Sequence, residues 1–371
     1  MADPRVRKLA DLLVNYCVTV QPGDKVMLTS GSAAMPLVLE TYRQIIRAGG
    51  LPSIFWDDNQ FREIMLTEGS EEQILYVPDP IMLAVKTFDC RITIRSDENT
   101  RALSGIDPAK QQLAASGRRE LMQTFMQRSA TGDLRWVGTL FPTNAYAQDA
   151  DMSLAEYADF VYGACHADKD DPVAEWQKLS RFQQQLVDYL VGKDKVEVKG
   201  PNADLSLSIK GRTFINSDGH KNMPSGEIFT GPVETSVNGW IRYTYPAIYQ
   251  GREVEGIELW FEEGKVVKAT AVKNEAFLHS VLDTDEGACY LGEFAIGTND
   301  AIDHFTGSIL FDEKIGGTIH LAVGSGYPET GSTNKSAVHW DMICDMQDGG
   351  EIWVDGELFY ENGRFPQFPR E

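Results

Sequence analysis

The stretch Lys25–Trp56 is KVMLTSGSAAMPLVLETYRQIIRAGGLPSIFW, and its hydrophobic period changes twice. Residues 25–30 and 52–56 are short apolar runs typical of strands, whereas residues 35–48 carry apolar side chains at helical spacing. The Gly49-Gly50 pair after the helical segment is a typical helix stop and turn. A strand, a helix and a second strand in this order predict two parallel strands covered by a helix.

The same alternation extends in both directions from this stretch. It predicts helices at 5–14, 71–76, 109–128, 154–165 and 173–191, and strands at 90–95 and 135–140. We therefore expect residues 1–192 to form an α/β domain with a mostly parallel sheet. No GxGxxG motif follows a strand, and neither GxxxxGKS nor GxxxxGKT occurs, so we expect this domain to be a scaffold rather than a nucleotide site.

The pattern changes at Lys195. From there the chain consists of short alternating segments with glycine at or near their ends: VEVKG, DLSLSIKG, GWIRYTYPAIYQG, IELWFEEG and KVVKATAV. Such segments predict an antiparallel sheet. We expect residues 193–371 to form a β-rich, α+β and barrel-like C-terminal domain, with the boundary at Gly192-Lys193.

Composition and charge restrict the class of protein. A chain of 371 residues with 42% hydrophobic residues suits two ordinary globular domains. The net charge of −21 repels phosphate backbones and anionic lipids, so nucleic-acid and membrane-surface partners are disfavoured. A negative field favours metal ions or the protonated amino terminus of a peptide, although an acidic surface is more often only a soluble one.

The cysteines and the N-terminus indicate the compartment. The five cysteines are widely separated and form no CxxC pair, which disfavours a disulfide framework or a zinc ribbon. The first residues, MADPRVRKLADLLVNY, lack the apolar run of a signal peptide, and no stretch approaches the roughly 20 apolar residues of a membrane span. We expect a cytoplasmic protein with reduced thiols.

Histidines and carboxylates in the second half are candidate metal ligands. In SAVHWDM, His339 and Asp341 are two residues apart, so on a strand they project from the same face. In TIHLAVGSGYP, His320 ends an apolar, strand-like run, and Tyr327 follows beyond a glycine-rich turn. Such nitrogen and carboxylate ligands suit Zn, Co or Mn better than Ca. Taken alone, the first pair is also compatible with a structural hydrogen bond, and His320 with a core histidine.

Four motifs in this half resemble those of one known family. NMPSGEIFT at 222–230, LGE at 291–293 with GTN downstream, FDEKIGGTIHLAVGSGYPETG at 311–331 and SAVHWDM at 336–342 follow one another in that order. Together they resemble the aminopeptidase T and aminopeptidase S family of cocatalytic two-metal metallopeptidases. The resemblance covers nearly the whole chain.

The resemblance implies a site, a reaction and partners. By correspondence, the metal ligands are Glu227, Glu293, His320, His339 and Asp341, and the active-site tyrosine is Tyr327. Two divalent cations, Zn, Co or Mn, are expected to activate a water that releases N-terminal residues from short peptides with a free amino terminus. Tyr327 is expected to donate a hydrogen bond to the developing oxyanion. The family also implies a homodimer.

Glu313 departs from the family pattern. Six residues separate it from His320, whereas many relatives have four at this place. We therefore regard Glu313, together with Glu293, as a candidate general acid/base, and a charge at a strand end is the alternative for Glu313.

Two other functions compete with the aminopeptidase. One is a catalytically inactive metal-binding or scaffold protein of the same fold, although the complete ligand set and Tyr327 disfavour it. The other is a nucleotide-dependent α/β enzyme, which requires the phosphate loop that the sequence lacks.

Overall fold

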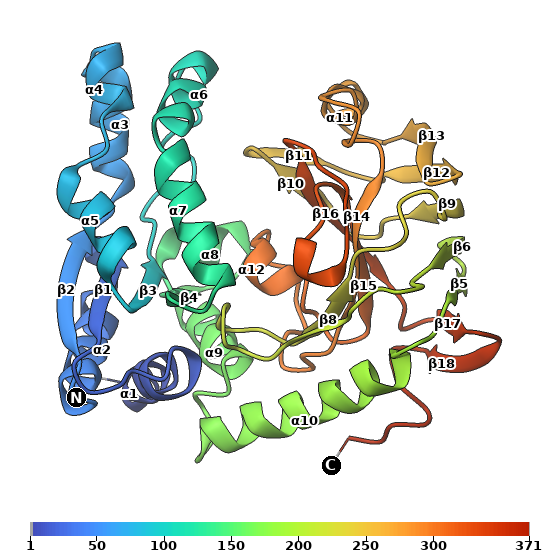
Figure 1. Ribbon diagram of the computed structural model, residues 1–371, viewed down its shortest axis with the longest axis horizontal. Coiled ribbons are helices and arrows are strands. Elements are labelled where there is room, and N and C mark those ends of the chain that lie inside the picture. The colour runs from blue at the N-terminus through green and yellow to red at the C-terminus, as the bar shows by residue number, and fades with distance from the viewer. Residues whose placement is uncertain (1–2, 371) are drawn as a thin grey trace. The chain divides into compact units, whose positions relative to one another are not determined.

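The computed structural model describes residues 3–370 (Figure 1). The chain forms two compact units: the first runs to Val173 and includes Gly219–Pro224, and the second contains Ala174–Asp218 and the chain from Ser225 onward. Nearly all of α10 (Pro172–Leu190) groups with the second unit. The sequence had placed the boundary after this helix. The helix groups with the second unit because Phe182, Leu186 and Leu190 are buried in that unit's core.

A four-stranded parallel sheet organises the first unit. Its order is β2-β1-β3-β4, and every neighbouring pair is parallel, which confirms the predicted α/β fold. The strands are β1 (Lys25–Ser30), β2 (Leu51–Trp56), β3 (Cys90–Arg95) and β4 (Arg135–Leu140). Helix α2 (Met35–Arg47) connects β1 to β2, and the chain turns back at Gly49 with φ +84°.

Helices pack on both faces of this sheet. Met27 of β1 contacts a cluster formed by Ala84 and Val85 of α5 (Asp79–Thr87) and Phe125 of α7 (Arg119–Ala130). The neighbours of Met27 in β1 point to the opposite face and are also buried. The other helical elements are α1 (Pro4–Asp11), π-helical η1 (Leu12–Cys17), 3-10 helical η2 (Ser32–Ala34), α3 (Asn59–Glu68), α4 (Glu71–Leu75), α6 (Pro108–Gly117), α8 (Asn144–Asp149) and α9 (Leu154–Ala164).

The structure differs from the predicted helices in two ways. The predicted helix at 109–128 is two helices, α6 and α7, which meet at Gly117 and Arg118. Gly117 packs against Leu75, where a Cβ would lie 2.6 Å from the carbonyl oxygen of Leu75. Helices α3, α5 and α8 were not predicted. Helix α3 buries only Leu66, so its apolar pattern carries little signal.

Two antiparallel sheets and a hairpin form the second unit, which confirms the predicted β-rich domain (Figure 1). The seven-stranded sheet has the order β13-β12-β9-β6-β5-β17-β18: β13 (Lys265–Thr270), β12 (Glu258–Glu262), β9 (Asn238–Arg242), β6 (Ala203–Ser208), β5 (Lys195–Gly200), β17 (Glu351–Val354) and β18 (Glu357–Glu361). The five-stranded sheet has the order β16-β15-β14-β8-β7: β16 (His339–Asp345), β15 (Thr318–Gly324), β14 (Leu291–Gly297), β8 (Glu227–Thr230) and β7 (Ile215–Ser217). The other elements are β10 (Ala247–Tyr249), β11 (Arg252–Val254), α11 (Glu275–Leu282), α12 (Ile309–Asp312) and η3 (Pro328–Thr330).

One face of the five-stranded sheet lies in the core of the second unit. Phe294 of β14, Leu321 of β15 and Met342 of β16 belong to the same buried cluster as Val198 and Leu259 of the seven-stranded sheet. Side chains alternate between the two faces of a strand. The intervening residues of β14, β15 and β16 therefore point to the other face of the five-stranded sheet.

Candidate metal centre

Four neighbouring strands carry the five residues that were predicted to bind metal. Glu227 begins β8, Glu293 lies in β14, His320 in β15, and His339 and Asp341 in β16. These strands are adjacent in the sheet order β16-β15-β14-β8. His320 is the third residue of β15 and not the end of a strand. The tertiary structure thus brings residues from four distant segments to one sheet.

The register places these side chains on the face opposite the core. Glu293 pairs with Ala322, and Ala322 pairs with Asp341 on its other side. In the same way Gly324 pairs with His339. Residues directly opposite each other in an antiparallel pair point to the same face. On this face of the sheet, only the methyl group of Ala322 therefore lies between the carboxylates of Glu293 and Asp341.

The same arrangement surrounds the other two predicted ligands. His320 pairs with Ala295, and Glu227 pairs with Gly297. Each long polar side chain is thus next to alanine or glycine on at least one neighbouring strand. These small neighbours leave room for the carboxylates and imidazoles to converge.

A β-bulge at Gly292 determines where Glu293 points. Leu291 pairs with Val323, but Glu293 pairs with Ala322, so one extra residue is inserted in β14. In a regular ladder Glu293 would oppose Leu321, whose side chain is in the core. The bulge moves Glu293 to the opposite face. Glycine fits this position because a Cβ there would lie 2.4 Å from the carbonyl oxygens of Gly324 and Ser325.

Glu293 stands between the two imidazoles. Its Oε1 is 3.5 Å from Nε2 of His320, and its Oε2 is 3.4 Å from Nε2 of His339. Oε2 of Glu227 lies 3.5 Å from the same His320 nitrogen, and Oδ1 of Asp341 lies 3.5 Å from the same His339 nitrogen. The cluster consists of two sets of candidate ligands that share the carboxylate of Glu293, with one oxygen facing each set.

Two further residues from the loop after α12 join the cluster. Glu313 caps the C-terminus of α12, and its carboxylate groups with His320 and Asp341, with all ligand atoms within 4.8 Å of one another. The alternative of a charge at a strand end is therefore not what the structure shows. Lys314 is fully buried, forms an ion pair with Glu313, and its Nζ is 3.8 Å from Oε1 of Glu227.

Tyr327 lies at the edge of the cluster. Its ring contacts the rings of His339 and Phe229, each at 5.3 Å between centroids. Its carbonyl oxygen accepts hydrogen bonds from both the amide and the hydroxyl of Thr330, which fixes the turn. Burial raises the pKa of the Tyr327 hydroxyl, and the carboxylates of Glu293 and Asp341 raise it further. The phenol therefore stays protonated and is able to donate a hydrogen bond.

Burial dominates the electrostatics of the three glutamates, and it outweighs the neighbouring positive charges of Lys314 and His320. Burial raises the pKa of Glu227, Glu293 and Glu313. Burial by itself raises the pKa of Asp341, but His339, His320 and Lys314 together outweigh it and lower the pKa of Asp341 to about 2.

The pKa values of the two histidines are also raised, but here neighbouring charges outweigh burial. Burial by itself lowers the pKa of an imidazole, but Glu293 and Glu227 raise the pKa of His320 to about 9. Asp341 and Glu293 likewise raise the pKa of His339 to about 10. The cluster thus favours positive charge strongly enough to overcome desolvation at both rings.

Hydrogen bonds from neighbouring groups orient some of these side chains. Nδ1 of His339 lies 2.7 Å from the carbonyl oxygen of Ser325, which leaves Nε2 facing the carboxylates. The backbone carbonyl of Glu227 accepts a 2.9 Å bond from Nε2 of the buried Gln183, whose Oε1 accepts a bond from Thr298. Gln183 thereby ties α10 to the beginning of β8.

The donor set fits divalent cations. Oε2 of Glu227 and Oδ1 of Asp341 are buried without a hydrogen-bond partner, an arrangement that is costly unless another partner binds there. With neutral imidazoles, the four carboxylates and the one ammonium of Lys314 carry a net charge of −3. Two divalent cations would nearly neutralise this charge. Carboxylates and imidazole nitrogens are ligands for Zn, Co and Mn.

Sequence reasoning missed several residues that build this site. The bulge at Gly292 is suggested only by the break in alternation within LGEFAIG, where Leu291 and Phe294 both face the core. Lys314 was treated only as part of a spacing, and Gln183 only as part of a helix. Their roles depend on contacts with segments distant in sequence, which spacing does not reveal.

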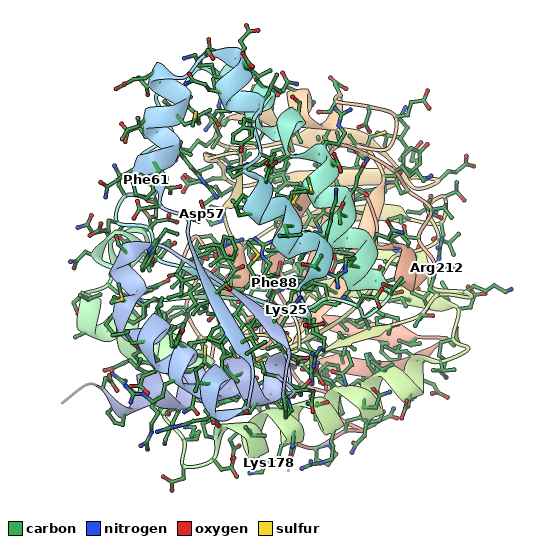
Figure 2. The ribbon with its side chains drawn as sticks, turned by 60° about the vertical axis from the view of Figure 1, so that its left-hand side comes forward. Lys25, Asp57, Phe61, Phe88, Lys178 and Arg212 are labelled. Atoms are coloured by element: carbon green, nitrogen blue, oxygen red, sulfur yellow. The ribbon has the colours of Figure 1, made fainter. Side chains whose placement is uncertain are left out.

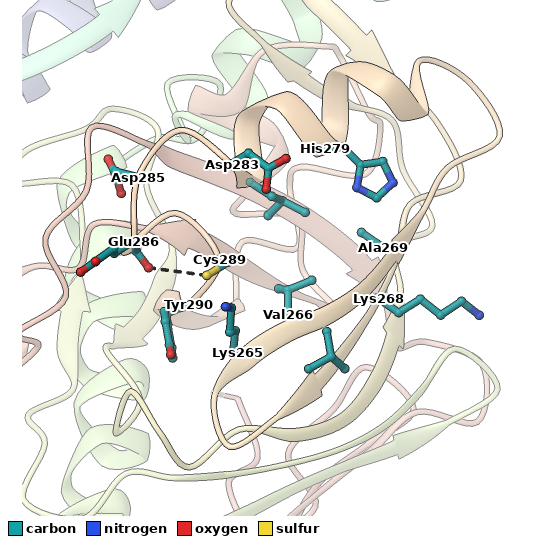
Figure 3. A pocket seen from close by; sticks show the side chains of 12 residues that line it. Lys265, Val266, Lys268, Ala269, His279, Asp283, Asp285, Glu286, Cys289 and Tyr290 are labelled. Carbon is teal, nitrogen blue, oxygen red and sulfur yellow. Dashed lines mark hydrogen bonds between the residues drawn. The ribbon is translucent and has the colours of Figure 1, made fainter.

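A surface pocket elsewhere in the second unit contains none of the predicted site residues. It has a volume of about 800 Å³ and lies between β13 and α11 (Figure 3). Lys265, Lys268, His279, Asp283 and Cys289 are among its lining residues. The carboxylate and imidazole cluster is therefore a separate feature.

Comparisons with known proteins agree with this architecture. The family model for thermophilic metalloprotease (M29) matches residues 2–365. The chain is 27% identical to aminopeptidase T of Thermus thermophilus, with 96% of this chain and 95% of the relative covered, and 28% identical to aminopeptidase 2 of Geobacillus stearothermophilus, with 94% and 93% covered.

Solved structures show the same fold. Wild-type AmpT from Thermus thermophilus superimposes with a TM-score of 0.85 at 24% identity, covering 98% of this chain and 99% of the other. The 2,5-dihydroxypyridine dioxygenase of Pseudomonas putida has a TM-score of 0.60 at 11% identity, covering 97% and 96%. At these identities the likeness concerns the fold alone.

The fold and the cluster, together with these relatives, define a metal-dependent peptidase, and so a hydrolase. The chain belongs to the thermophilic metalloprotease (M29) family, whose model matches nearly its whole length. The family resemblance and the enzyme class expected from the sequence are both confirmed.

Proposed function

We propose that the protein is an aminopeptidase that removes N-terminal residues from short peptides by means of two divalent cations, with Zn, Co or Mn as candidates. Glu227, Glu293 and His320 would hold one cation, and Glu293, His339 and Asp341 the other. The observation that carries the proposal is the position of Glu293, whose two oxygens face different imidazoles at 3.5 and 3.4 Å. The names of the curated relatives support the aminopeptidase assignment.

The bound cations would supply Lewis acidity and lower the pKa of a water molecule toward neutrality. The protein's own residues do the rest. Tyr327 donates a hydrogen bond to the oxyanion that develops on the scissile carbonyl. Glu313 moves the proton from the attacking water to the leaving amine, because both oxygens of Glu293 serve as metal ligands in this scheme. One of the carboxylates of the site would hold the free amino terminus of the substrate, which gives specificity for an unblocked N-terminus.

Metal removal and a blocked substrate test the proposed function. We expect the protein to hydrolyse aminoacyl-anilides, to lose this activity on dialysis against a chelator, and to regain it with Zn, Co or Mn. Peptides with an acetylated amino terminus should not be cleaved. The measurement is release of the chromophore, with mass spectrometry for peptides. Equal cleavage of free and acetylated peptides would contradict aminopeptidase specificity, and full activity in the chelator would contradict the metal mechanism.

Replacing Tyr327 by phenylalanine tests the oxyanion role. We expect Tyr327→Phe to lower kcat by about 100 to 1,000-fold, the usual loss when one oxyanion donor is removed. KM and the metal content should remain unchanged, because the ring contacts with His339 and Phe229 are kept. Tyr290→Phe, half-buried in the same unit, is the matched control and should keep full activity. Loss of metal in Tyr327→Phe would assign the tyrosine a structural role instead.

We also propose that the protein is a cytoplasmic homodimer. Among the described residues, no helix is both long and apolar enough to span a bilayer. Strand β2 is an edge strand of its sheet, and Leu51, Trp56 and the α2 residues Leu39 and Ile46 are exposed. Phe61, near the start of α3, is a further exposed apolar side chain of this unit (Figure 2). An unpaired edge flanked by apolar side chains is typical of an interface. Light scattering at the mass of a single chain would contradict the dimer.

A further inference from the structure

Lys314 is the one lysine or arginine among the described residues that is completely buried, with 0% of its surface exposed. Lysine is almost never fully buried unless it is paired, because desolvation of the ammonium is costly. Its position next to the candidate ligands therefore requires an explanation. The metal scheme above assigns no role to Lys314.

The backbone holds Lys314 in place on both sides. Its amide donates a 2.9 Å hydrogen bond to the carbonyl oxygen of Phe311, and its own carbonyl accepts a 3.1 Å bond from the amide of Asn299. The next residue, Ile315, packs so closely on Gly297 at the end of β14 that a Cβ on Gly297 would lie 2.1 Å from the Ile315 carbonyl oxygen. A closely packed loop thus fixes the position of the Lys314 ammonium in the cluster.

The two carboxylate oxygens of Glu227 face different partners. Nζ lies 3.8 Å from Oε1 of Glu227 and forms an ion pair with Oε1 of Glu313. Oε2 of Glu227 lies 3.5 Å from Nε2 of His320 and has no hydrogen-bond partner. One oxygen of Glu227 is therefore directed to the ammonium, and the other is left for a ligand of the cluster.

We propose that Lys314 is a positioning residue that holds Glu227 and Glu313 so that Oε2 of Glu227 is presented to the metal site formed with Glu293 and His320. The inference rests on the proposed metal function. Its direct effect falls on this site, since the ion pairs of Lys314 are with Glu227 and Glu313, whereas Asp341 of the other site experiences only the charge of the ammonium.

A role of Lys314 in balancing charge and a role in orienting ligands predict opposite changes in metal affinity when Lys314 is replaced. If the ammonium only balanced charge, its removal would leave the cluster more negative and strengthen cation binding. If it orients the ligands, its removal weakens cation binding, and loss of an orienting partner typically costs about 10 to 100-fold in metal affinity. The sign of the change therefore separates the two roles.

The test uses the full-length, metal-free protein and calorimetric titration with Zn²⁺, together with thermal unfolding in a chelator. Lys314→Met removes the charge and the donors at similar length, and Lys314→Gln keeps a donor without the charge. Lys273→Met is the matched control, because Lys273 also pairs with two glutamates, at 2.6 and 2.7 Å, but at the surface. If Lys314→Met does not fold, Lys314→Gln carries the test.

We expect Lys314→Met to weaken one of two Zn²⁺ sites by about 10 to 100-fold and to change the other site less. Lys314→Gln should fall between Lys314→Met and the wild type, and Lys273→Met should bind like the wild type. If Lys314→Met binds Zn²⁺ as tightly as the wild type or more tightly, the inference is overturned while the proposed function stands. If Lys314→Met does not fold, the same result for Lys314→Gln overturns it. Wild-type protein that binds no divalent cation would overturn the proposed function and, with it, the inference.

Discussion

Glu293→Gln is expected to abolish hydrolysis and to empty both metal sites. Each oxygen of Glu293 faces a different imidazole, so the amide removes a charged ligand from both sets at once. Metal ions stabilise a hydrolytic transition state by several kcal/mol. At 1.36 kcal/mol for each factor of ten, kcat/KM should fall by about 1,000-fold or more. The measurements are aminoacyl-anilide hydrolysis and metal content by mass spectrometry.

The matched control for this variant is Glu262→Gln. Glu262 is a strand glutamate of the same unit, but it is exposed at the end of β12. It should retain both metals and full activity. If Glu293→Gln kept two tightly bound metals and wild-type activity, Glu293 would not be the shared ligand.

Ala322→Val is expected to disable the site although Ala322 carries no polar group. Ala322 is fully buried between Glu293 on one side and Asp341 on the other. Two added methyl groups would project between these two carboxylates and push them apart. Displacement of a reacting group by about 1 Å can cost about 100-fold in rate. We expect activity to fall by about this factor, and metal affinity to fall with it.

A core substitution on the same strand distinguishes this effect from a general loss of stability. Val323→Ile adds a methylene on the opposite, core face of β15. Overpacking costs about 1 to 3 kcal/mol in unfolding free energy at either position. Val323→Ile should therefore lower the melting temperature and keep the metals, whereas Ala322→Val should lose them. Full metal binding by Ala322→Val would contradict this prediction, because the space between Glu293 and Asp341 would then accommodate a larger side chain.

Sequence patterns identified much of the first unit because its elements are short and locally encoded. The bounds of β1, β3 and β4 were predicted correctly, since β1 is a largely buried run and the apolar residues of β3 and β4 are buried at strand spacing. The break between α6 and α7 was not predicted, because it depends on the contact of Gly117 with Leu75, far away in the sequence. The grouping of α10 with the second unit likewise depends on side chains that only the folded core brings together.

The sequence by itself determined the class of fold, the family and the kinds of side chain available to bind metal. Local periodicity and sequence motifs can be recognised without any tertiary information. Only the tertiary structure decided that these side chains meet. The bulge at Gly292 turns Glu293 to the correct face, Ala322 leaves room between the strands, and the loop after α12 brings Lys314 against Glu227. Each of these depends on strand register or long-range packing, which arise from contacts between distant segments and not from any local pattern.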